Sequence, residues 1–361
     1  MPDALSMNAV PSAPHQAATP TPAPRVRERP AAPGVPAPLP LIYILSSGRS
    51  GSTLLDLLLG QHERIWTLGE LQVLPWELRE HRAPCACGAP LESCDFFGPL
   101  LAELPLSSAG ARLERFRESH GFGRVLRGPL LGDLLLGGPR GARRAEAEAY
   151  AELNARLLTR LWSAARERQP AGLEYLVDSS KDPYRLAWLA ASGRFALKVI
   201  HVYKDPRAFV HSMTRREGAR AGSVLRFSGR WAVENALMSY LGSTLPPQSF
   251  LNLEYESLAG DPDRALARIG RFLGLEFPAG HGQRLRSERL HAISGNEMRW
   301  QQSGIELDQR WRQELPAWAR RLTAAATWPW WLLRAGRRRL LSEAPGPNPE
   351  RAEAAQHPHA A

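Results

Sequence analysis

The chain has 361 residues, of which 43% are hydrophobic and 23% are charged. This composition is ordinary for a globular protein and excludes disorder over the whole length. The 46 basic residues exceed the 36 acidic ones and give a formal net charge of +10. A positive net charge favours anionic ligands, but the arginines are spread along the whole chain, so we expect no nucleic-acid-binding surface.

Three features of the sequence bear on the compartment. No apolar run reaches the ~18 residues of a membrane-spanning helix. The N-terminus lacks the basic-then-apolar order of a secretory signal. The chain has only three cysteines, which are too few for a disulfide framework. We therefore expect a cytoplasmic enzyme.

Composition also predicts the limits of the folded part. Residues 1–40 hold 11 of the 31 prolines and no aromatic residue, so this segment cannot bury enough apolar surface to become ordered. Residues 342–361 are similar, and we predict a disordered tail at each end. The folded domain then covers 41–325, and a short Trp- and Arg-rich amphipathic segment covers 326–341.

Strands and helices alternate along the folded part. Four short apolar runs predict strands: 41–45, 173–177, 196–203 and 250–253. Helices are predicted at 54–59, 145–168, 183–191, 207–217 and 229–241. This order predicts an α/β fold with a central, mostly parallel sheet covered on both faces.

The alternation breaks between residues 75 and 145. This stretch carries all three cysteines and helix-like pieces such as 110–118. It is too long for a plain loop, so we interpret it as a helical insertion over one edge of the sheet. Such an insertion could form a lid over an acceptor pocket or be a purely structural excursion.

A loop rich in glycine and serine joins the first strand to the first helix. Its glycines let successive backbone N–H groups point at one anion, and the helix N-terminus adds partial positive charge. A glycine-rich turn before a capped helix is the simpler alternative. The predicted phosphate-binding residues are Ser47, Gly48, Arg49, Ser50, Gly51, Ser52 and Thr53.

The loop differs from a Walker loop at one position. A Walker loop has lysine after its last glycine, whereas Gly51 is followed here by Ser52. The cation that reaches the β- and γ-phosphates is therefore missing. This absence disfavours a kinase that uses ATP and favours a nucleotide with a single anionic group at its 5′ end.

The stretch from Gly48 to Leu55 resembles the 5′-phosphosulfate loop of sulfotransferases that use 3′-phosphoadenosine 5′-phosphosulfate (PAPS). Arginine in the loop is similar to the carbohydrate and tyrosylprotein members. A second block, from Val199 onward, is similar to the strand and helix that hold the 3′-phosphate. By this resemblance, Lys204 and Ser212 bind that phosphate, although the family usually has arginine at the first position. Arg207 could supply the missing guanidinium fork.

Further stretches extend the resemblance to about residues 41–315. Trp231 and Asn235 lie four residues apart on one predicted helix. Tyr255 opens a segment similar to the family's Tyr-Glu-x-Leu motif. The stretch that begins at His291 is similar to the C-terminal cofactor segment of bacterial members, and it implies cofactor contacts by Ser294, Asn296 and Arg299. The family's fold is a three-layer fold like that of the P-loop NTPases.

Sulfuryl transfer requires cations at the leaving group and a base for the acceptor proton. Arg49 is the candidate cation of the loop. Lys181 resembles the lysine in the Lys-Asp-Pro of tyrosylprotein sulfotransferases, although it could equally be a surface lysine before a proline-initiated helix. Glu70 resembles the catalytic glutamate of the same enzymes. His62 is an alternative base, with helix capping as its simpler role.

The cysteines fall within ten residues of one another. Cys85, Cys87 and Cys94 could offer three thiolates to a structural zinc ion, with His81 as the fourth ligand. A disulfide would leave one odd thiol. A packed loop of free thiols is the alternative.

The C-terminal segment combines Trp328, Trp330 and Trp331 with three arginines at 337–339. Aromatic side chains beside arginines are typical of a helix that lies at a membrane surface. Packing against the fold or onto a second copy is equally compatible with the pattern.

Together, these features predict a PAPS-dependent sulfotransferase. Its acceptor would be a hydroxyl or amine on a small molecule, carbohydrate or lipid, and no catalytic metal is required. Two alternatives remain at this point: a nucleotide or small-molecule kinase of related fold, and a nucleotide-binding module without turnover. The sequence identifies neither the acceptor nor the oligomeric state.

Overall fold

The computed structural model describes one compact unit within residues Ala31–Ala361. The described ranges are 37–81, 83–103, 128–283, 290–300 and 304–342. The predicted tails lie almost entirely outside these ranges, so their disorder stays a prediction.

Five parallel strands form the central sheet. They are β1 (Leu39–Ser46), β2 (Ile65–Thr67), β3 (Tyr175–Lys181), β4 (Phe195–Tyr203) and β5 (Phe250–Glu254). Their order is β2-β3-β1-β4-β5, and every neighbouring pair is parallel. The prediction of an α/β fold with a parallel sheet is therefore confirmed. The three-residue strand β2 was not predicted.

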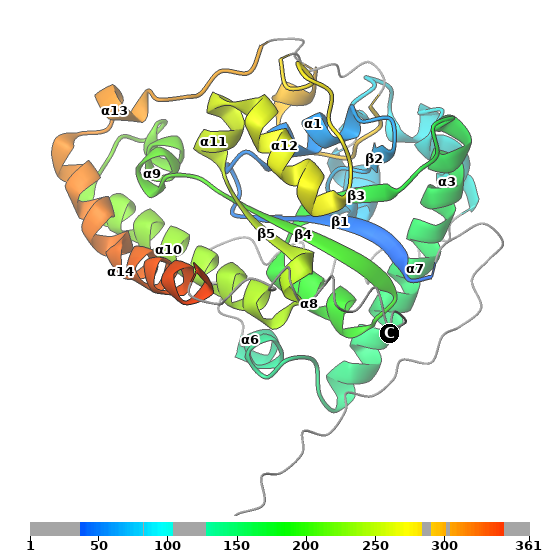
Figure 1. Cartoon of the computed structure of the whole chain (residues 1–361), viewed down its shortest axis with the longest axis horizontal. Coiled ribbons are helices and arrows are strands. Elements are labelled where there is room, and N and C mark those ends of the chain that lie inside the picture. The colour runs from blue at the N-terminus through cyan, green and yellow to red at the C-terminus, as the bar shows by residue number, and fades with distance from the viewer. Residues whose placement is uncertain (1–36, 82, 104–127, 284–289, 301–303, 343–361) are drawn as a thin grey trace, which may run out of the picture. The chain divides into compact units, whose positions relative to one another are not determined.

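Helices cover both faces of the sheet (Figure 1). The longer ones are α1 (Ser52–Gly60), α7 (Ala142–Arg168), α8 (Pro183–Ala191), α9 (Pro206–Thr214), α10 (Ala221–Thr244), α12 (Pro262–Leu273) and α14 (Ala317–Ser342). The shorter ones are α2 (Leu74–Trp76), α3 (Phe97–Glu103), α6 (Gly128–Leu135), α11 (Tyr255–Gly260) and α13 (Trp311–Glu314).

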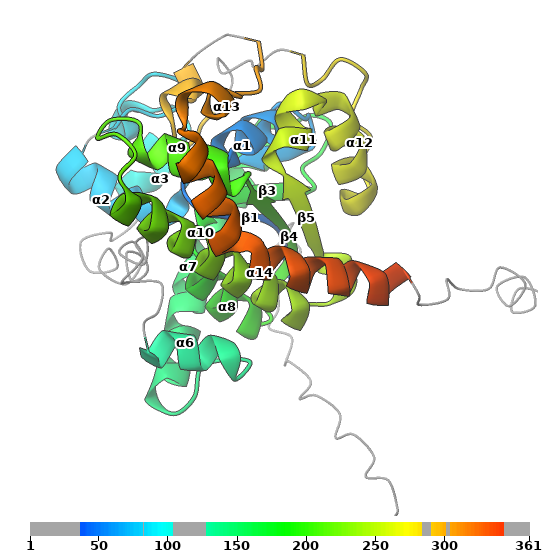
Figure 2. The same cartoon turned by 90° about the vertical axis from the view of Figure 1, so that its left-hand side faces the viewer.

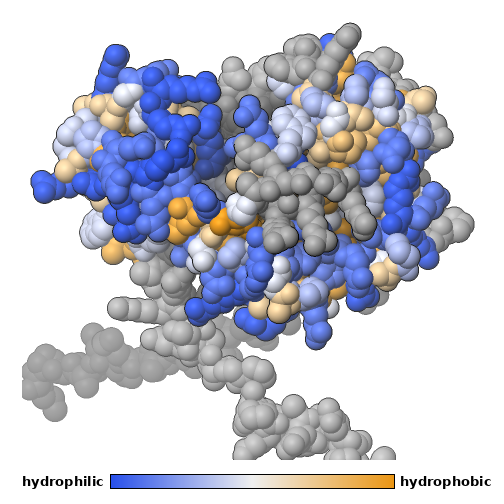
Figure 3. Space-filling model, turned by 90° about the horizontal axis from the view of Figure 1, so that it is seen from above, coloured by the Kyte–Doolittle hydropathy of each residue, from blue (hydrophilic) through white to orange (hydrophobic). Residues whose placement is uncertain are grey.

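Alternate residues of β1 enter two different cores. Leu41 and Tyr43 pack with side chains of α7, α8 and α10 on one face, while Ile42 and Ile44 pack with α1, α11 and α12 on the other. This alternation is what a strand buried on both faces requires. The surface seen from above is predominantly hydrophilic, with a small apolar area near its centre (Figure 3).

The predicted Trp- and Arg-rich segment is the second half of α14, which runs without a break across residue 326. Figure 2 shows α14 crossing α10. Trp330 is 4% exposed and packs edge-on against Tyr203 and Trp231, whereas Trp328 is 60% exposed. Packing against the fold thus accounts for Trp330. Among the described helices, none combines the length and the apolar character that crossing a bilayer requires.

The predicted insertion at 75–145 contains α3, α6 and several short turns. Its helix-like piece at 110–118 lies outside the described residues. The long helix α7 begins at Ala142, within the predicted insertion, and ends at Arg168 as predicted. Helix α6, which precedes α7 in the chain, packs against α8 and lies below the sheet in the view of Figure 1.

Candidate active site

The loop between β1 and α1 is held in a tight turn. Gly51 adopts a left-handed conformation with φ +89°, and the Tyr255 ring lies against its Cα. Any Cβ at this position would collide with that ring, so residue 51 has to be glycine. Arg49 is also left-handed, with φ +64°, which is uncommon for a residue with a side chain. The loop therefore has the curled backbone that phosphate binding requires.

Two side chains of the loop show how it could hold an anion. The Ser50 hydroxyl is fully buried and has no hydrogen-bond partner among the described residues. An unpartnered buried hydroxyl is costly unless a ligand completes it. Ser47 Oγ accepts a hydrogen bond from Asn235 Nδ2 at 3.4 Å, which links the loop to α10. The positive end of α1 faces the same turn.

Lys204 follows β4 directly and is almost fully buried, with 8% of its surface exposed. Its Nζ lies 4.3 Å from the centre of the Tyr255 ring, the ring that packs on Gly51. Burial lowers the pKa of Lys204, while Asp308 and Glu256 act in the opposite direction. No carboxylate of the described part of the chain forms an ion pair with Lys204, so this buried lysine is suited to receive a phosphate.

The other two residues predicted for the 3′-phosphate are engaged locally. Arg207 forms a two-pronged ion pair with Asp205, at 3.0 and 2.6 Å, and stacks 4.5 Å from the centre of the Trp311 ring. Ser212 Oγ donates to the carbonyl of Phe209 at 2.7 Å. A phosphate at either side chain would have to share these contacts, so their assignment stays a prediction.

Glu70 and Lys181, which were predicted from separate motifs, lie in contact. Lys181 Nζ donates a hydrogen bond to Glu70 Oε1, and the two side chains are 12% and 15% exposed, respectively. Lys181 is the last residue of β3 and pairs in register with Leu45 of β1. The acid and the cation therefore lie beside the start of the phosphate loop, at the carboxyl edge of the sheet where α/β proteins bind ligands.

A buried polar network supports the end of β3. Arg185 of α8 forms an ion pair with Asp178 at 2.6 Å, and both side chains are fully buried. Arg185 also donates to Asn154 Oδ1 at 2.8 Å. Gln72 Nε2 donates to the carbonyl of Ser180, the residue before Lys181, at 2.7 Å. Removing one member of such a buried pair would leave an uncompensated charge, so we expect this network to stabilise the end of β3.

Asp56 of α1 is a buried acidic residue that is linked through Thr67 to the turn before Glu70. The Thr67 hydroxyl donates to Asp56 Oδ1 at 2.5 Å and accepts from the backbone N–H of Gly69 at 3.4 Å. Burial raises the pKa of Asp56 to about 7, although the hydrogen bond from Thr67 opposes the shift. These two hydrogen bonds fix the turn that precedes Glu70.

The predicted C-terminal cofactor segment reaches both parts of the site. Ile293 pairs with the backbone at Glu70, the candidate base, because its carbonyl accepts from the N–H of Glu70 at 2.8 Å. Three residues further on, the N–H of Asn296 donates to Thr53 Oγ1 of the phosphate loop at 3.3 Å. Arg299 is buried and donates to the carbonyl of Ser294, so it holds the segment in a closed turn.

His62, the alternative base, is occupied on both sides of its ring. Its Nδ1 accepts from the backbone N–H of Arg64 at 3.1 Å, and its Nε2 lies 3.1 Å from the carbonyl oxygen of Glu276. Burial lowers the pKa of His62. Both ring nitrogens of His62 are thus engaged with backbone groups of Arg64 and Glu276, which indicates a structural role. Glu70 is the base candidate that faces Lys181.

The three cysteines gather in the structure, and their fourth neighbour is His291. The predicted fourth ligand, His81, has a side chain outside the described residues. A hydrogen bond from the Cys85 thiol lowers the pKa of Cys94 to about 4, with His291 acting in the same direction. The group therefore favours a thiolate at Cys94.

The parallel sheet, the helices on both of its faces and the glycine-containing loop between β1 and α1 define a three-layer α/β protein. The sequence model of the sulfotransferase family matches residues 134–279, a stretch that contains Lys181, Lys204 and Tyr255. This match agrees with the sulfotransferase resemblance that the motifs of the sequence carry. The phosphate loop and Glu70 precede the matched stretch.

Several solved structures are similar to this chain. The sulfotransferase domain of the Synechococcus PCC 7002 olefin synthase has 23% identity and a TM-score of 0.48, covering 84% of this chain and 98% of that one. The sulfotransferase domain from the curacin biosynthetic pathway has 19% identity and a TM-score of 0.45, covering 79% and 96%. A sulfotransferase from Alicyclobacillus acidocaldarius has 13% identity and a TM-score of 0.33, covering 80% and 94%. A search of curated proteins gives no match.

Four residues of the site and of the cysteine cluster were not assigned a role from the sequence. Asp56, Arg185 and Asp178 are buried polar residues whose partners lie in other elements, and no spacing in the sequence reveals such pairs. His291 lies within a stretch that the family resemblance covers, but nothing in the sequence places it beside the cysteines.

Proposed function

We propose that this chain is a sulfotransferase, an enzyme that transfers a sulfuryl group from PAPS to a hydroxyl or amine acceptor by in-line displacement. The contact between Glu70 and Lys181 beside the phosphate loop carries the proposal. It offers a proton acceptor and a cation within one hydrogen bond of each other, at the edge where the loop would hold the donor.

The residues at this edge fit the two anionic ends of the donor. The 5′ group suits the loop, where the Ser50 hydroxyl has no partner within the described ranges and the N-terminus of α1 contributes positive charge. The 3′-phosphate suits Lys204, with Ser212 one helix turn beyond Arg207. When bound, PAPS supplies an activated sulfuryl group on a phosphate leaving group.

The side chains of this chain then have distinct tasks. Arg49 and Lys181 stabilise negative charge that develops on the leaving and transferring oxygens, because a fixed cation in a site of low dielectric is most effective there. Glu70 accepts the proton of the acceptor hydroxyl or amine on a carboxylate oxygen. The closed turn from Ser294 to Arg299 orients the segment that contacts Thr53.

Two features disfavour the kinase alternative. Ser52 occupies the position of the Walker lysine, so the loop lacks the cation for the β- and γ-phosphates. Asp178, the acidic residue of β3, is fully buried and paired with Arg185, so it is not free to hold Mg²⁺. A mononucleotide with separate 3′ and 5′ anionic groups, bound without metal, is therefore the better match to the residues present.

Isothermal titration calorimetry tests the donor. Adenosine 3′,5′-bisphosphate should bind with micromolar affinity, adenosine 5′-monophosphate far more weakly, and ATP with Mg²⁺ not measurably. Lys204→Ala should weaken bisphosphate binding about 10- to 100-fold, the loss expected for one charge-assisted phosphate contact.

Lys198→Ala is the matched control, because Lys198 lies on the same strand but donates to the carbonyls of Gln248 and Phe272. It should leave bisphosphate affinity unchanged. Tight binding of ATP with Mg²⁺ and none of the bisphosphate would overturn the proposed donor. Bisphosphate binding without turnover of PAPS by any hydroxyl or amine acceptor would favour a binding module.

A further inference from the structure

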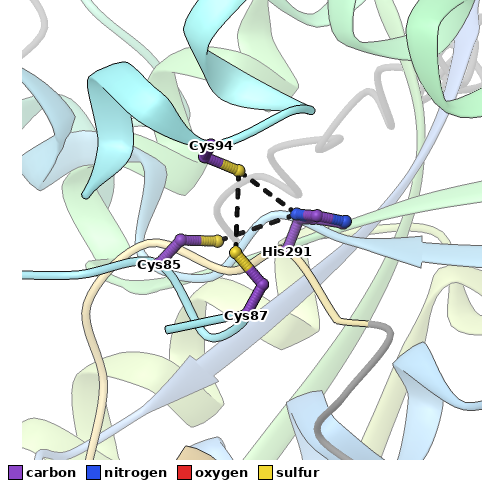
Figure 4. Close-up of side chains that lie close together, drawn as sticks. All are labelled: Cys85, Cys87, Cys94 and His291. Atoms are coloured by element: carbon purple, nitrogen blue, oxygen red, sulfur yellow. Dashed lines mark hydrogen bonds between the residues drawn. The ribbon is translucent and has the colours of Figure 1, made fainter. Parts of the chain in front are cut away.

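Three thiols and one imidazole converge outside the proposed active site (Figure 4). The ligand-type atoms of Cys85, Cys87, Cys94 and His291 all lie within 4.8 Å of one another. Cys94 Sγ is 3.2 Å from His291 Nδ1 and 3.9 Å from Cys87 Sγ, and Cys85 Sγ is 3.9 Å from the same ring nitrogen. The four side chains come from two segments that are about 200 residues apart in the sequence.

We propose that Cys85, Cys87, Cys94 and His291 bind one zinc ion in a closed, structural site. Three sulfurs at ~2.3 Å and one nitrogen at ~2.0 Å around a tetrahedral ion would lie roughly 3.5–3.8 Å from one another. The observed distances of 3.2, 3.9 and 3.9 Å between these ligand atoms lie just below and just above this range. Thiolates with an imidazole are the donor set that zinc prefers among the common divalent ions, and four protein ligands leave no position for a catalytic water.

The surroundings of the cluster hold its ligands in place. The Cys85–Gly88 turn is closed by a backbone hydrogen bond of 2.8 Å, and the N–H of Phe97 donates to Cys94 Sγ at 3.5 Å. The His291 ring stacks on Trp66, with 5.7 Å between ring centres and an angle of 8°. A backbone N–H that points at a cysteine sulfur stabilises a thiolate, and a stacked imidazole loses little freedom on binding.

The ion would join the insertion to the C-terminal cofactor segment. His291 is two residues from Ile293, which pairs with the backbone of Glu70 and Leu68, and five from Asn296, which contacts the phosphate loop. A zinc ion would thus fix the segment that approaches both the proposed base and the proposed nucleotide site. This consequence for nucleotide binding rests on the proposed function, whereas the metal site does not.

Asp95 is the one further acidic side chain described next to the cluster. Its Oδ1 lies 3.6 Å from His291 Nδ1, but the side chain is 76% exposed. An exposed carboxylate at this distance can pair with the imidazole in the metal-free protein. It is not required for a complete four-ligand set, so Asp95→Asn should retain the metal.

The first experiment measures metal in the full chain, purified without a polyhistidine tag after expression with added zinc. Mass spectrometry of the metals should find about one zinc ion per chain. X-ray absorption at the zinc edge should give three sulfurs and one nitrogen at the distances expected for tetrahedral zinc. These readouts need neither donor nor acceptor, so they stand even if the proposed reaction is wrong.

Variants then assign the ligands. Cys87→Ser, at the half-buried thiol, and His291→Ala should each reduce the zinc content at least tenfold, since three ligands hold zinc poorly. His281→Ala is the matched control, because this partly buried histidine hydrogen-bonds to the carbonyl of Leu58 and packs on Phe277, and it is not part of the cluster. It should leave the zinc content unchanged. If a variant fails to fold, the absorption spectrum of the unchanged chain still decides the ligand set.

Three outcomes would overturn the proposal. The first is a chain grown with zinc that contains only background metal. The second is zinc that persists in both Cys87→Ser and His291→Ala, or that is lost in Asp95→Asn. The third is an intact mass that shows a disulfide between two of the three cysteines in the freshly purified protein. A consequence to check afterwards is weaker bisphosphate binding upon removal of zinc by a chelator.

Discussion

Lys-Asp-Pro occurs twice in this chain, at residues 181–183 and 204–206, and the two copies lie at the ends of β3 and β4, the strands that flank β1. Each aspartate caps the following helix: Asp182 accepts from two backbone N–H groups of α8, and Asp205 accepts from one of α9. Each proline takes the first helical position, where its missing N–H costs nothing. The same three residues therefore produce the same strand-to-helix turn twice.

The two lysines nevertheless have different surroundings. Lys181 has a left-handed backbone with φ +69° and forms an ion pair with Glu70. Lys204 is buried against the Tyr255 ring, and burial lowers its pKa. Residues from other elements, not the motif, thus decide the chemistry of each lysine. One is placed to act with an acid during transfer, and the other is placed to hold a phosphate.

Removing the acid should have the largest effect. Glu70→Gln keeps an oxygen that can accept from Lys181 but cannot take a proton, so turnover should fall roughly 10²- to 10⁴-fold. Bisphosphate affinity should stay within about threefold, because Glu70 does not face Lys204. Steady-state kinetics with PAPS and calorimetry measure the two quantities.

Glu63→Gln is the control, because Glu63 is an exposed glutamate just before β2. It should leave turnover and bisphosphate affinity unchanged. Unaltered turnover in Glu70→Gln would mean that another group accepts the proton. The proposal that Lys181 acts together with an acid, and Lys204 does not, would then be wrong.

Lys181→Ala should come next in size. Loss of one cation that stabilises developing charge lowers turnover about 10²- to 10³-fold. The affinity for the bisphosphate should be nearly unchanged, whereas Lys204→Ala should weaken affinity and lower turnover less at saturating donor. If Lys181→Ala instead weakens bisphosphate binding and spares turnover at saturation, the two lysines have the opposite roles.

Removal of either capping aspartate should have a smaller effect, a loss of unfolding free energy that differs between Asp182 and Asp205. Asp182 is fully buried and accepts from the N–H groups of Tyr184 and Arg185, at 2.8 and 2.9 Å. Asp205 accepts from the N–H of Arg207 and is partly exposed. Loss of an N-cap costs about 0.5–2 kcal/mol. We expect Asp182→Ala near the upper limit and Asp205→Ala near the middle of this range, measured by urea denaturation. Equal losses would indicate that burial does not strengthen the first cap.

The parts of the site that depend on nearby residues could be predicted from the sequence. The phosphate loop and both Lys-Asp-Pro turns are continuous stretches, and their residue types alone specify a strand, a turn and a helix start. The parallel sheet followed from the alternation of strands and helices. Strand β2 was missed because three residues, Ile65–Thr67, are too few to show a periodic pattern.

Contacts between distant segments could not be predicted in the same way. His291 joins cysteines about 200 residues earlier only because the chain returns along Leu68 and Glu70, which no local pattern encodes. The Trp- and Arg-rich segment predicted at 326–341 lies within α14, which begins at Ala317. Pro329 lies inside that helix, which its packing against α10 stabilises. Tertiary packing overrides local preference in both cases.

The smallest effect should come from the protonation of Lys204. Since burial lowers its pKa below the usual 10.5, the amine becomes neutral at a lower pH than an exposed lysine would. The bisphosphate keeps its charge above neutral pH, so its affinity should fall several-fold between neutral pH and about pH 10 as Lys204 loses its proton. Lys204→Arg keeps its charge throughout this range, so its affinity should vary little with pH. A fall of the same size in Lys204→Arg would show that another group titrates, and Lys204 would then differ from Lys181 in position alone.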